Sequence, residues 1–349
     1  MRVLITGNLG YIGPVLHRVL LSLYPGIEII GYDTGFFGHC QTNAQFIPEH
    51  GVSIQYLADV RDISSAILEG VDAIVHLAAV SNDPMGSEFE AITADINRGA
   101  SVRLARLAAI AGVKHFVFAS SCSMYGQAEG AARKETDQTN PLTAYARSKI
   151  GVESDLQKVD LKGMVFTSLR FATACGWSSR LRLDLVLNDF VACAISTGQI
   201  SILSDGTPWR PLIDVEDMSR AIAWALARER NNGGQFLAVN AGMNEGNYQV
   251  KQLAEAVATQ IAGTTISINQ DAPPDKRSYS VDFSLFKALA PNHQPQVPLE
   301  MSIVRLRDGL LGMRFADKEF RESSYMRLNT LRQHIKHNRV GANLRWNKF

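Results

Sequence analysis

Short runs of apolar residues alternate with longer amphipathic stretches through the first half of the chain. The runs are continuous rather than alternating, which is typical of strands covered on both faces of a parallel sheet. They lie at 2–6, 27–33, 53–60, 72–79, 115–121 and 164–172. Helical patterns such as 91–111 and 144–159 separate them. This order predicts an α/β fold with a Rossmann-type doubly wound parallel sheet.

The alternating pattern of expected strands and helices changes after about residue 172. The elements expected there are helix 183–198, strand 200–203, helix 216–229, strand 235–242 and helix 248–263. The chain should therefore leave the first domain, return to it and leave again. The predicted units are a large domain (1–172 and about 213–245), a smaller, discontinuous C-terminal substrate lobe (about 173–212 and 246–315) and a basic appendage (316–349).

Composition and charge exclude several classes of protein. Apolar residues make up 46% of the chain, charged residues 20%, and the net charge is +1, as in ordinary soluble globular proteins. No apolar run approaches the roughly 20 residues that span a bilayer, and no secretory signal precedes the first strand. The basic residues of the appendage are interleaved with acidic and apolar ones, which favours packing over nucleic-acid binding. We expect a cytoplasmic protein without membrane or nucleic-acid partners.

The cysteines show no pattern of metal ligation. They are widely separated, with no CxxC pair and no Cys/His spacing of a zinc site. The four are Cys40, Cys122, Cys175 and Cys193. Reduced thiols and no metal site are therefore predicted.

The stretch TGNLGYIG (6–13) follows the first predicted strand and opens a helix. Its glycines permit a tight turn and let backbone N–H groups approach a pyrophosphate at the helix N-terminus. Asp33 ends the second strand, where a carboxylate binds an adenosine ribose hydroxyl and repels a 2′-phosphate, which favours NAD over NADP. Asp59 and Val60 are candidates for the adenine edge, a solvated turn being the alternative for Asp59. The cofactor residues assigned from the turn are Gly7, Asn8, Gly10, Tyr11, Ile12 and Gly13.

Tyr145 and Lys149 lie four residues apart and therefore share one face of a predicted helix. A neighbouring ammonium, together with the positive nicotinamide of oxidised NAD, would lower the pKa of the phenol from its usual value near 10. Such a tyrosine can remove a proton from a secondary alcohol while hydride leaves the same carbon. A coincidental pair on a solvated helix is the alternative.

Taken in order, TGxxGxxG, the ribose Asp, HLAA (76–79), SSxxxYG (120–126) and YxxxK resemble the extended short-chain dehydrogenase/reductases that modify nucleotide sugars. The resemblance covers about residues 1–290. It implies that Tyr145 is the catalytic base, that Lys149 holds the nicotinamide ribose and that Ser121 hydrogen-bonds the reacting hydroxyl. It also implies NAD contacts by Leu77, Ala78 and Ala79, and a homodimer built through helices 91–111 and 144–159.

A second match lies in GTPWRPLIDVED (206–217), which resembles the family's G…RxxIHVxD stretch. It implies that Arg210 binds the diphosphate of a nucleotide sugar, with Asp214 in place of the usual His. Asn188 and Thr173 fall at positions that contact the substrate in the family. Ala272 stands where a second diphosphate arginine is expected, so Arg277 is the candidate substitute. A structural surface role is the alternative for these residues.

The stretch SSCSMYG (120–126) narrows the choice among the reactions of this family. The 4,6-dehydratases of the family carry acidic residues at the positions of Cys122 and Ser123, whereas UDP-glucose 4-epimerases resemble SSATVYG. We therefore predict an NAD-dependent nucleotide-sugar epimerase that oxidises a sugar carbinol, often at C4. Ser121, Cys122 and Ser123 are assigned to the substrate side, with packing as the alternative for Cys122.

Other reactions stay open on the same scaffold. They are a 4-dehydrogenase or ketoreductase, an atypical dehydratase that recruits another base, and an NAD-sensing binding protein without catalysis. Retention of both Tyr145 and Lys149 argues against the last of these.

Overall fold

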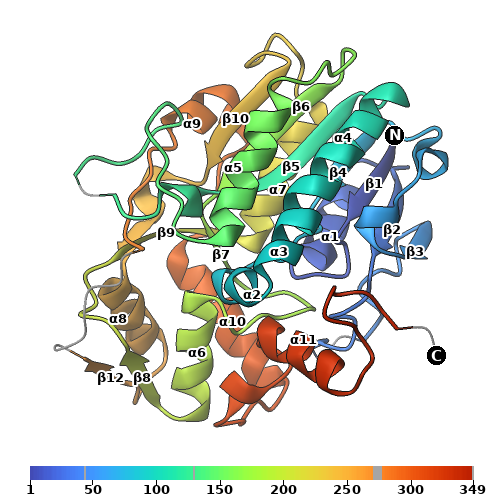
Figure 1. The fold of residues 1–349 in the computed structure, drawn as a ribbon. Coiled ribbons are helices and arrows are strands. Elements are labelled where there is room, and N and C mark those ends of the chain that lie inside the picture. Colours follow the sequence, from blue (N-terminus) through green and yellow to red (C-terminus); the bar gives the residue numbers. More distant parts are fainter. Residues whose placement is uncertain (43–44, 129, 270–276, 348–349) are drawn as a thin grey trace.

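A seven-stranded sheet forms the centre of the larger part of the molecule (Figure 1). The computed structural model describes residues 1–42, 45–128, 130–269 and 277–347. Across the sheet the strands are β10 (Phe236–Ala241), β6 (Val165–Phe171), β5 (His115–Ser121), β4 (Ala73–His76), β1 (Arg2–Thr6), β2 (Glu28–Asp33) and β3 (Ile54–Leu57). All neighbours pair in parallel. The strand order reverses between β1 and β4, so the predicted doubly wound sheet is confirmed, with a ligand crevice expected at that point.

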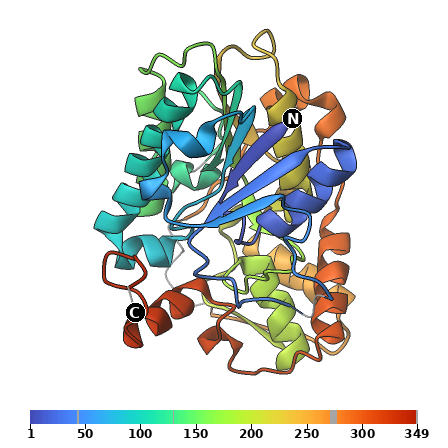
Figure 2. The same cartoon turned by 90° about the vertical axis from the view of Figure 1, so that its right-hand side faces the viewer.

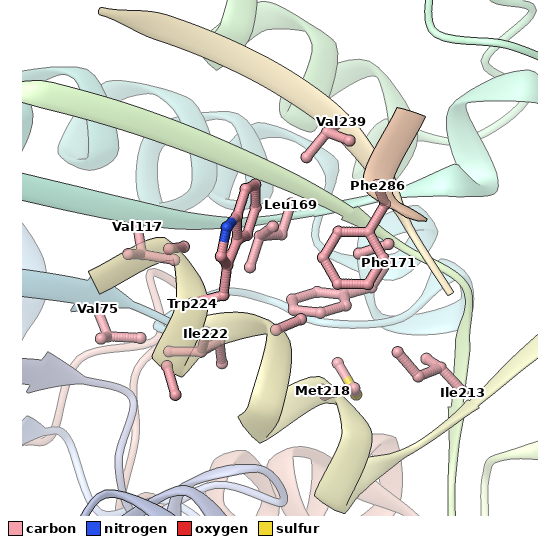
Figure 3. Close-up of a cluster of buried hydrophobic side chains, with 14 of the residues drawn as sticks. Val75, Val117, Leu169, Phe171, Ile213, Met218, Ile222, Trp224, Val239 and Phe286 are labelled. Atoms are coloured by element: carbon pink, nitrogen blue, oxygen red, sulfur yellow. The ribbon is translucent and has the colours of Figure 1, made fainter. Parts of the chain in front are cut away.

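The sheet is buried on both faces because successive side chains of each strand point to opposite sides. In β1, Val3 and Ile5 pack into one apolar cluster and Leu4 into another, and all three are fully buried. Helix α7 (Val215–Ala227) covers the first face, with Ile222 and Trp224 against strand side chains (Figure 3). The other helices on that face are α1 (Gly13–Leu23) and α9 (Ser284–Leu289).

The opposite face is covered by α4 (Ser101–Ile110) and α5 (Ala144–Leu156), with α2 (Asp83–Glu88) beside them. The predicted helix 91–111 is formed, but in three pieces: α3 (Glu90–Thr93), a π-helical stretch (Ala94–Ala100) and α4. The wider π-turn contains Asn97, whose buried side chain bonds both backbone groups of Val80 and the Ser148 hydroxyl. Stretches of this kind occur frequently beside functional sites.

A smaller lobe follows the sixth strand and has its own apolar cluster. Its strands are β7 (Thr173–Cys175), β9 (Trp209–Asp214) and β11 (Asn247–Gln249) in one sheet, and β8 (Gln199–Ile202) and β12 (Thr265–Ile268) in another. Its helices are α6 (Val186–Ser196), α8 (Val250–Gln260) and α10 (Leu299–Gly312). Short 3₁₀ turns span Val60–Asp62, Ser65–Leu68, Cys122–Tyr125, Asn244–Gly246, Pro291–His293 and Phe320–Glu322. The domain boundaries stay a prediction.

The C-terminal residues cross from one part of the molecule to the other. Phe320 belongs to the apolar cluster of the smaller lobe, whereas Leu331 of α11 (Arg327–Lys336) and Leu344 belong to a cluster of the large sheet. Figure 2 shows this red segment beside the blue N-terminal strands. Across the described ranges, no helix has the length and apolar character needed to cross a membrane. The homodimer stays a prediction.

His17 of α1 makes the fold sensitive to acid. It is 2% exposed, and neither ring nitrogen has a hydrogen-bond partner among the described residues. Burial, with the nearby Arg180 cation, lowers its pKa to about 4. Below about pH 6.5 the unfolded chain binds a proton that the native state refuses until about pH 4. As the pH falls through that window, this histidine therefore lowers the free energy of unfolding by about 1.4 kcal/mol per pH unit.

We expect His17→Leu to remove this acid sensitivity. Between pH 7.5 and pH 4.5 the variant should lose about 2–3 kcal/mol less free energy of unfolding than the wild type. Urea unfolding at both pH values measures the difference, with the exposed His50 replaced by Leu as the matched control. Equal losses in the wild type and His17→Leu would show that His17 is not buried as a neutral ring.

Candidate active site

A cavity of about 840 Å³ opens at the carboxyl ends of the central strands. Its wall includes the turn after β1, the ends of β2 and β5, the first turn of α5, and residues of the smaller lobe and C-terminal segment. Most of the predicted site residues lie on this one surface. They are Gly7, Gly10, Tyr11, Ile12, Asp33, Asp59, Val60, Leu77, Ala78, Ala79, Ser121, Ser123, Tyr145, Lys149, Thr173, Arg210 and Arg277.

The turn after β1 is built so that only glycine fits at two of its positions. Gly7 has a φ of +76°, and a Cβ there would lie 2.5 Å from the backbone nitrogen of Ala78. A Cβ at Gly13 would lie 1.8 Å from the carbonyl oxygen of Asn8. The backbone of the turn can therefore come close to a phosphate at the N-terminus of α1, the arrangement that a dinucleotide requires.

Asn8 and Gly13 support this turn from beneath. Asn8 is fully buried, and its Nδ2 donates to Gln55 Oε1 at 2.7 Å. Neither residue lines the cavity, unlike Gly7 and Gly10. The side chain of Asn8, which the sequence assigns to the cofactor turn, ties that turn to β3.

Asp33 is held by its own backbone surroundings. Its carboxylate accepts N–H groups of Leu9 at 3.1 Å and Gly35 at 2.7 Å. Burial raises the pKa of this carboxyl, and the two N–H donors oppose that shift. Each carboxylate oxygen keeps further acceptor capacity for ribose hydroxyls. The residues therefore fit NAD.

Asp59 is not a solvated turn residue. Arg61 clasps its carboxylate with Nε to Oδ1 at 3.0 Å and Nη2 to Oδ2 at 2.6 Å. The aspartate also caps its own 3₁₀ turn by accepting the Arg61 N–H at 2.8 Å. The pair therefore holds the Asp59 side chain in place at the wall of the cavity.

Helix α5 places Tyr145 and Lys149 over the end of β5. Thr143 caps the helix by accepting the Ala146 N–H at 3.2 Å, which puts Tyr145 in the first turn. The Tyr145 hydroxyl hydrogen-bonds Ser121, the last residue of β5. The Lys149 Nζ donates to the Ala119 carbonyl at 2.7 Å and lies 5.5 Å from the centre of the Tyr145 ring.

Burial shifts the pKa of both side chains of this pair. Burial and the Asp83 carboxylate raise the pKa of Tyr145 to about 12, while Arg182 and the hydrogen bond between Tyr145 and Ser121 oppose them. Burial lowers the pKa of Lys149 to about 7. Among the described residues, Arg182 is a cation that lowers the pKa of Tyr145, and the lowering by Lys149 together with the nicotinamide of bound NAD stays a prediction.

Cys122 and Ser123 are the first two residues of the 3₁₀ turn after β5, and their side chains have different surroundings. Ser123 lines the cavity, and its Oγ accepts the Ser121 hydroxyl at 2.9 Å. Cys122 is fully buried in the core, with Sγ donating to the Arg170 carbonyl at 3.0 Å, and burial raises the pKa of its thiol. The assignment of Cys122 to the substrate side is corrected in favour of packing.

The smaller lobe contributes Thr173, Arg210 and Arg277 to the cavity wall. Arg277 Nη1 donates to Asp83 Oδ2 at 3.2 Å; Ala272 lies outside the described residues. Asn188 does not reach the cavity. Its fully buried side chain accepts the Gly176 N–H at 3.0 Å and donates to the Arg182 carbonyl at 2.9 Å. The substrate role predicted for Asn188 is corrected to a structural one.

An ionic group on the cavity wall was not predicted from the sequence. Arg182 Nε donates to Asp184 Oδ1 at 2.9 Å, and Asn82 donates to the other oxygen of the same carboxylate. Both charged residues are at most about a tenth exposed in their side chains. The alternation of charge and leucine in RLRLD (180–184) was the available signal, because charges spaced by two inside an apolar run share one face. Among the described residues, no cluster of His, Cys, Asp or Glu could hold a metal ion.

A glycine turn, a ribose carboxylate and a Tyr–Lys pair on one cavity define an enzyme that works on a bound dinucleotide. Residues 3–242 match the model of the family described as NAD dependent epimerase/dehydratase, and the chain belongs to this family. Its cofactor is NAD. When NAD is bound, Gly7, Gly10 and Asp33 are the residues placed to hold it.

Curated relatives and solved structures agree with this family. The chain is 30% identical over 301 residues to a UDP-glucose 4-epimerase of Lacticaseibacillus casei, covering 78% of this chain and 86% of the relative. It is 28% identical over 273 residues to one of Corynebacterium glutamicum, covering 73% and 79%.

Two solved structures share the fold. One is the UDP-glucose 4-epimerase of Thermus thermophilus in complex with NAD, with a TM-score of 0.72, 24% identity, and coverage of 91% of this chain and 100% of that chain. The other is TunA, an NAD-dependent NDP-hexosamine 5,6-dehydratase of tunicamycin biosynthesis, with a TM-score of 0.75, 22% identity, and coverage of 91% and 99%.

Proposed function

We propose that this enzyme is a nucleotide-sugar epimerase that inverts a carbinol, at C4 of a hexose. The observation that carries the proposal is the pairing of Tyr145 with Ser121 on a cavity whose adjoining turn, 121–125, holds no carboxylate. An epimerase of this kind needs one proton-transfer group, whereas dehydration also needs a base for a carbon-bound proton. The curated relatives named above support UDP as the first nucleotide to test.

In this proposal the side chains at the end of β5 and the start of α5 remove and return the proton of one sugar hydroxyl. Ser121 hydrogen-bonds the sugar hydroxyl, and Tyr145, as phenolate, takes its proton as the carbinol becomes a ketone. Bound NAD supplies the acceptor, and later the donor, for the carbon-bound hydrogen with its electron pair. After the ketosugar presents its other face, Tyr145 returns the proton to the oxygen. Substrate and product then have equal mass, and no net oxidation occurs.

The part of the cavity wall contributed by the smaller lobe is proposed to bind the nucleotide of the sugar nucleotide. Arg210 and Arg277 are the guanidinium groups proposed for the diphosphate, since planar donors bind such anions in pairs. Thr173 lies on the same wall and is proposed to contact the sugar. Lys149 is proposed to hold the nicotinamide ribose.

One carboxylate of the wall favours a second candidate, an atypical dehydratase. Asp83 accepts the Thr143 hydroxyl at 2.7 Å and raises the pKa of Tyr145, so it lies near the reacting groups. It is the candidate base if a proton is removed from carbon. Loss of water from the product would select this reaction.

Product analysis tests the proposal. The enzyme is incubated with UDP-, GDP-, dTDP- and CDP-hexoses, and the products are identified by NMR and mass spectrometry. We expect one nucleotide sugar to give an isomer of unchanged mass without accumulation of NADH. Release of NADH would instead establish a dehydrogenase, and a product lighter by one water would establish the dehydratase.

A further inference from the structure

The C-terminal residues 320–347, called here the C-terminal strap, pass over the loops that follow β2 and β3. Figure 1 shows the red α11 below the blue strands β1, β2 and β3. Because Asp33 ends β2 and Asp59 follows β3, these loops belong to the dinucleotide end of the cavity. The strap therefore lies against the cofactor side of the site.

Trp346 fastens the strap to the loop after β2. Its Nε1 donates to the Thr34 carbonyl at 2.6 Å, and its ring lies 5.2 Å from Phe36 and 4.9 Å from His334. His334 Nε2 lies 2.9 Å from the Phe36 carbonyl oxygen. Indole, imidazole and phenyl rings thus close one end of the strap onto residues next to Asp33.

Arg61 fastens the strap to the loop after β3. The guanidinium that clasps Asp59 also donates to the carbonyls of Asn343 at 3.0 Å and Leu344 at 3.1 Å. Arg345 forms an ion pair with Asp62 from the other direction. Both loops that carry predicted cofactor contacts are therefore tied to the strap.

The strap also forms part of the cavity wall. Several of its residues face the same cavity as Gly7 and Asp33: Arg321, Met326, Arg327, Leu331 and Leu344. Leu331 and Leu344 supply apolar surface there. Arg327 supplies a cation.

Arg327 has hydrogen-bonding capacity that the protein does not use. The residue is 1% exposed, its Nη2 donates to the Arg180 carbonyl at 3.0 Å, and its guanidinium lies 4.7 Å from the centre of the Phe37 ring. Within the described ranges, Nη1 has no hydrogen-bond partner and no carboxylate forms an ion pair with this side chain. Arg180 and Arg182 are paired with Glu49 and Asp184.

A buried cation with unused donors on a cavity wall is suited to an anionic ligand, because an unpaired buried charge is costly. Burial lowers the pKa of Arg327 to about 10; Arg182 and Arg180 act in the same direction, whereas Cys40 and Asp184 oppose the shift. The group still carries its charge at neutral pH. It also lowers the pKa of Asp33.

We propose that the C-terminal strap completes the NAD site and that Arg327 binds the diphosphate of the dinucleotide. The position of the residue favours NAD over the sugar nucleotide as the source of this diphosphate. Arg327 contacts Phe37 in the loop that begins at Asp33, whereas Arg210 and Arg277, the arginines proposed for the sugar nucleotide, come from the smaller lobe.

Ligand titration of purified protein tests this assignment without any measurement of turnover. Arg327→Met keeps most of the side-chain volume and removes the guanidinium; Arg327→Lys keeps the charge and loses the planar fork. Isothermal titration with NAD, ADP and adenosine separates the diphosphate from the base and ribose, and titration with UDP reports on the site of the sugar nucleotide. Arg332→Met is the matched control, because Arg332 is on the same helix but exposed, and it pairs with Glu88.

We expect Arg327→Met to lower the affinity for NAD and ADP about 10- to 100-fold and to leave the affinity for adenosine within about twofold of the wild type. The affinities of Arg327→Lys should lie between those of Arg327→Met and the wild type. Unchanged affinity for NAD and ADP, or an equal loss for adenosine, would overturn the proposal. A loss confined to UDP would also overturn it by assigning Arg327 to the sugar nucleotide. If Arg327→Met fails to fold by circular dichroism, the ADP-to-adenosine ratio of Arg327→Lys decides.

Discussion

Tyr145→Phe should lower turnover by about 10³-fold or more while NAD affinity changes little. The phenol hydroxyl is the one group of Tyr145 that the substitution removes, and the ring keeps its place at the start of α5. Ser121 then retains its bond to the sugar hydroxyl, but no base remains to take the proton of that hydroxyl. Because burial raises the pKa of Tyr145 to about 12, the hydroxyl works only when a cation stabilises its phenolate.

The measurement pairs steady-state turnover with NAD titration for Tyr145→Phe and for a control. Tyr24→Phe is the control, since the Tyr24 hydroxyl donates to the Ala223 carbonyl, outside the residues that line the cavity. Turnover should fall only in Tyr145→Phe. Turnover near the wild-type level in that variant would remove Tyr145 from the mechanism.

Lys149→Met should lower turnover by about 10²-fold or more and lower the affinity for NAD about 10- to 100-fold. The hydrogen bond to Ala119 uses one of the three N–H donors of the ammonium, which leaves two for ribose hydroxyls. Methionine fills the same volume without a donor. Lys158→Met, at an exposed position just after α5, is the control. Wild-type NAD affinity in Lys149→Met would contradict the ribose role.

The same substitution should make the protein without nucleotide more stable. The pKa of Lys149 is about 7 in the folded protein, against about 10.5 when unfolded, so the unfolded chain holds the extra proton between these values. Burial of the charge thus costs the wild type up to about 4 kcal/mol of unfolding free energy at pH 7. Lys149→Met removes this cost but also loses the bond to Ala119, which offsets about 1–3 kcal/mol of the gain in stability. Urea unfolding should show a gain for Lys149→Met that shrinks as pH rises to about 10. A gain independent of pH would contradict the burial of a charge here.

Local patterns were enough to predict the large sheet and the turn after β1. Continuous apolar runs identify strands that are buried on both faces, and Gly7 and Gly13 stand where the surrounding backbone admits no Cβ. The resemblance to the family, rather than a local pattern, implied that Ser121 and Tyr145 act together, and in the structure the end of β5 and the start of α5 line one cavity. Cys122 shows the limit of composition alone: its neighbours face the cavity, while its own side chain belongs to the core.

Contacts between distant segments could not be predicted in this way. The C-terminal strap is polar and only weakly periodic, and its partners lie almost 300 residues earlier, as in the bond from Arg61 to Leu344. Asn188 was assigned by its position in the family pattern, yet its amide is used up by Gly176 and Arg182. Such outcomes depend on which groups the tertiary fold leaves unpaired, and no local pattern contains that information.

The central claim is that Tyr145 and bound NAD remove and return the hydrogens of one carbinol. The most direct test repeats the product analysis with the accepted nucleotide sugar deuterated at C4. We predict an isomer of equal mass that keeps its deuterium at C4, because the same hydrogen is returned to the opposite face. Loss of the label, its appearance in released NADH, or a product lighter by one water would contradict the account.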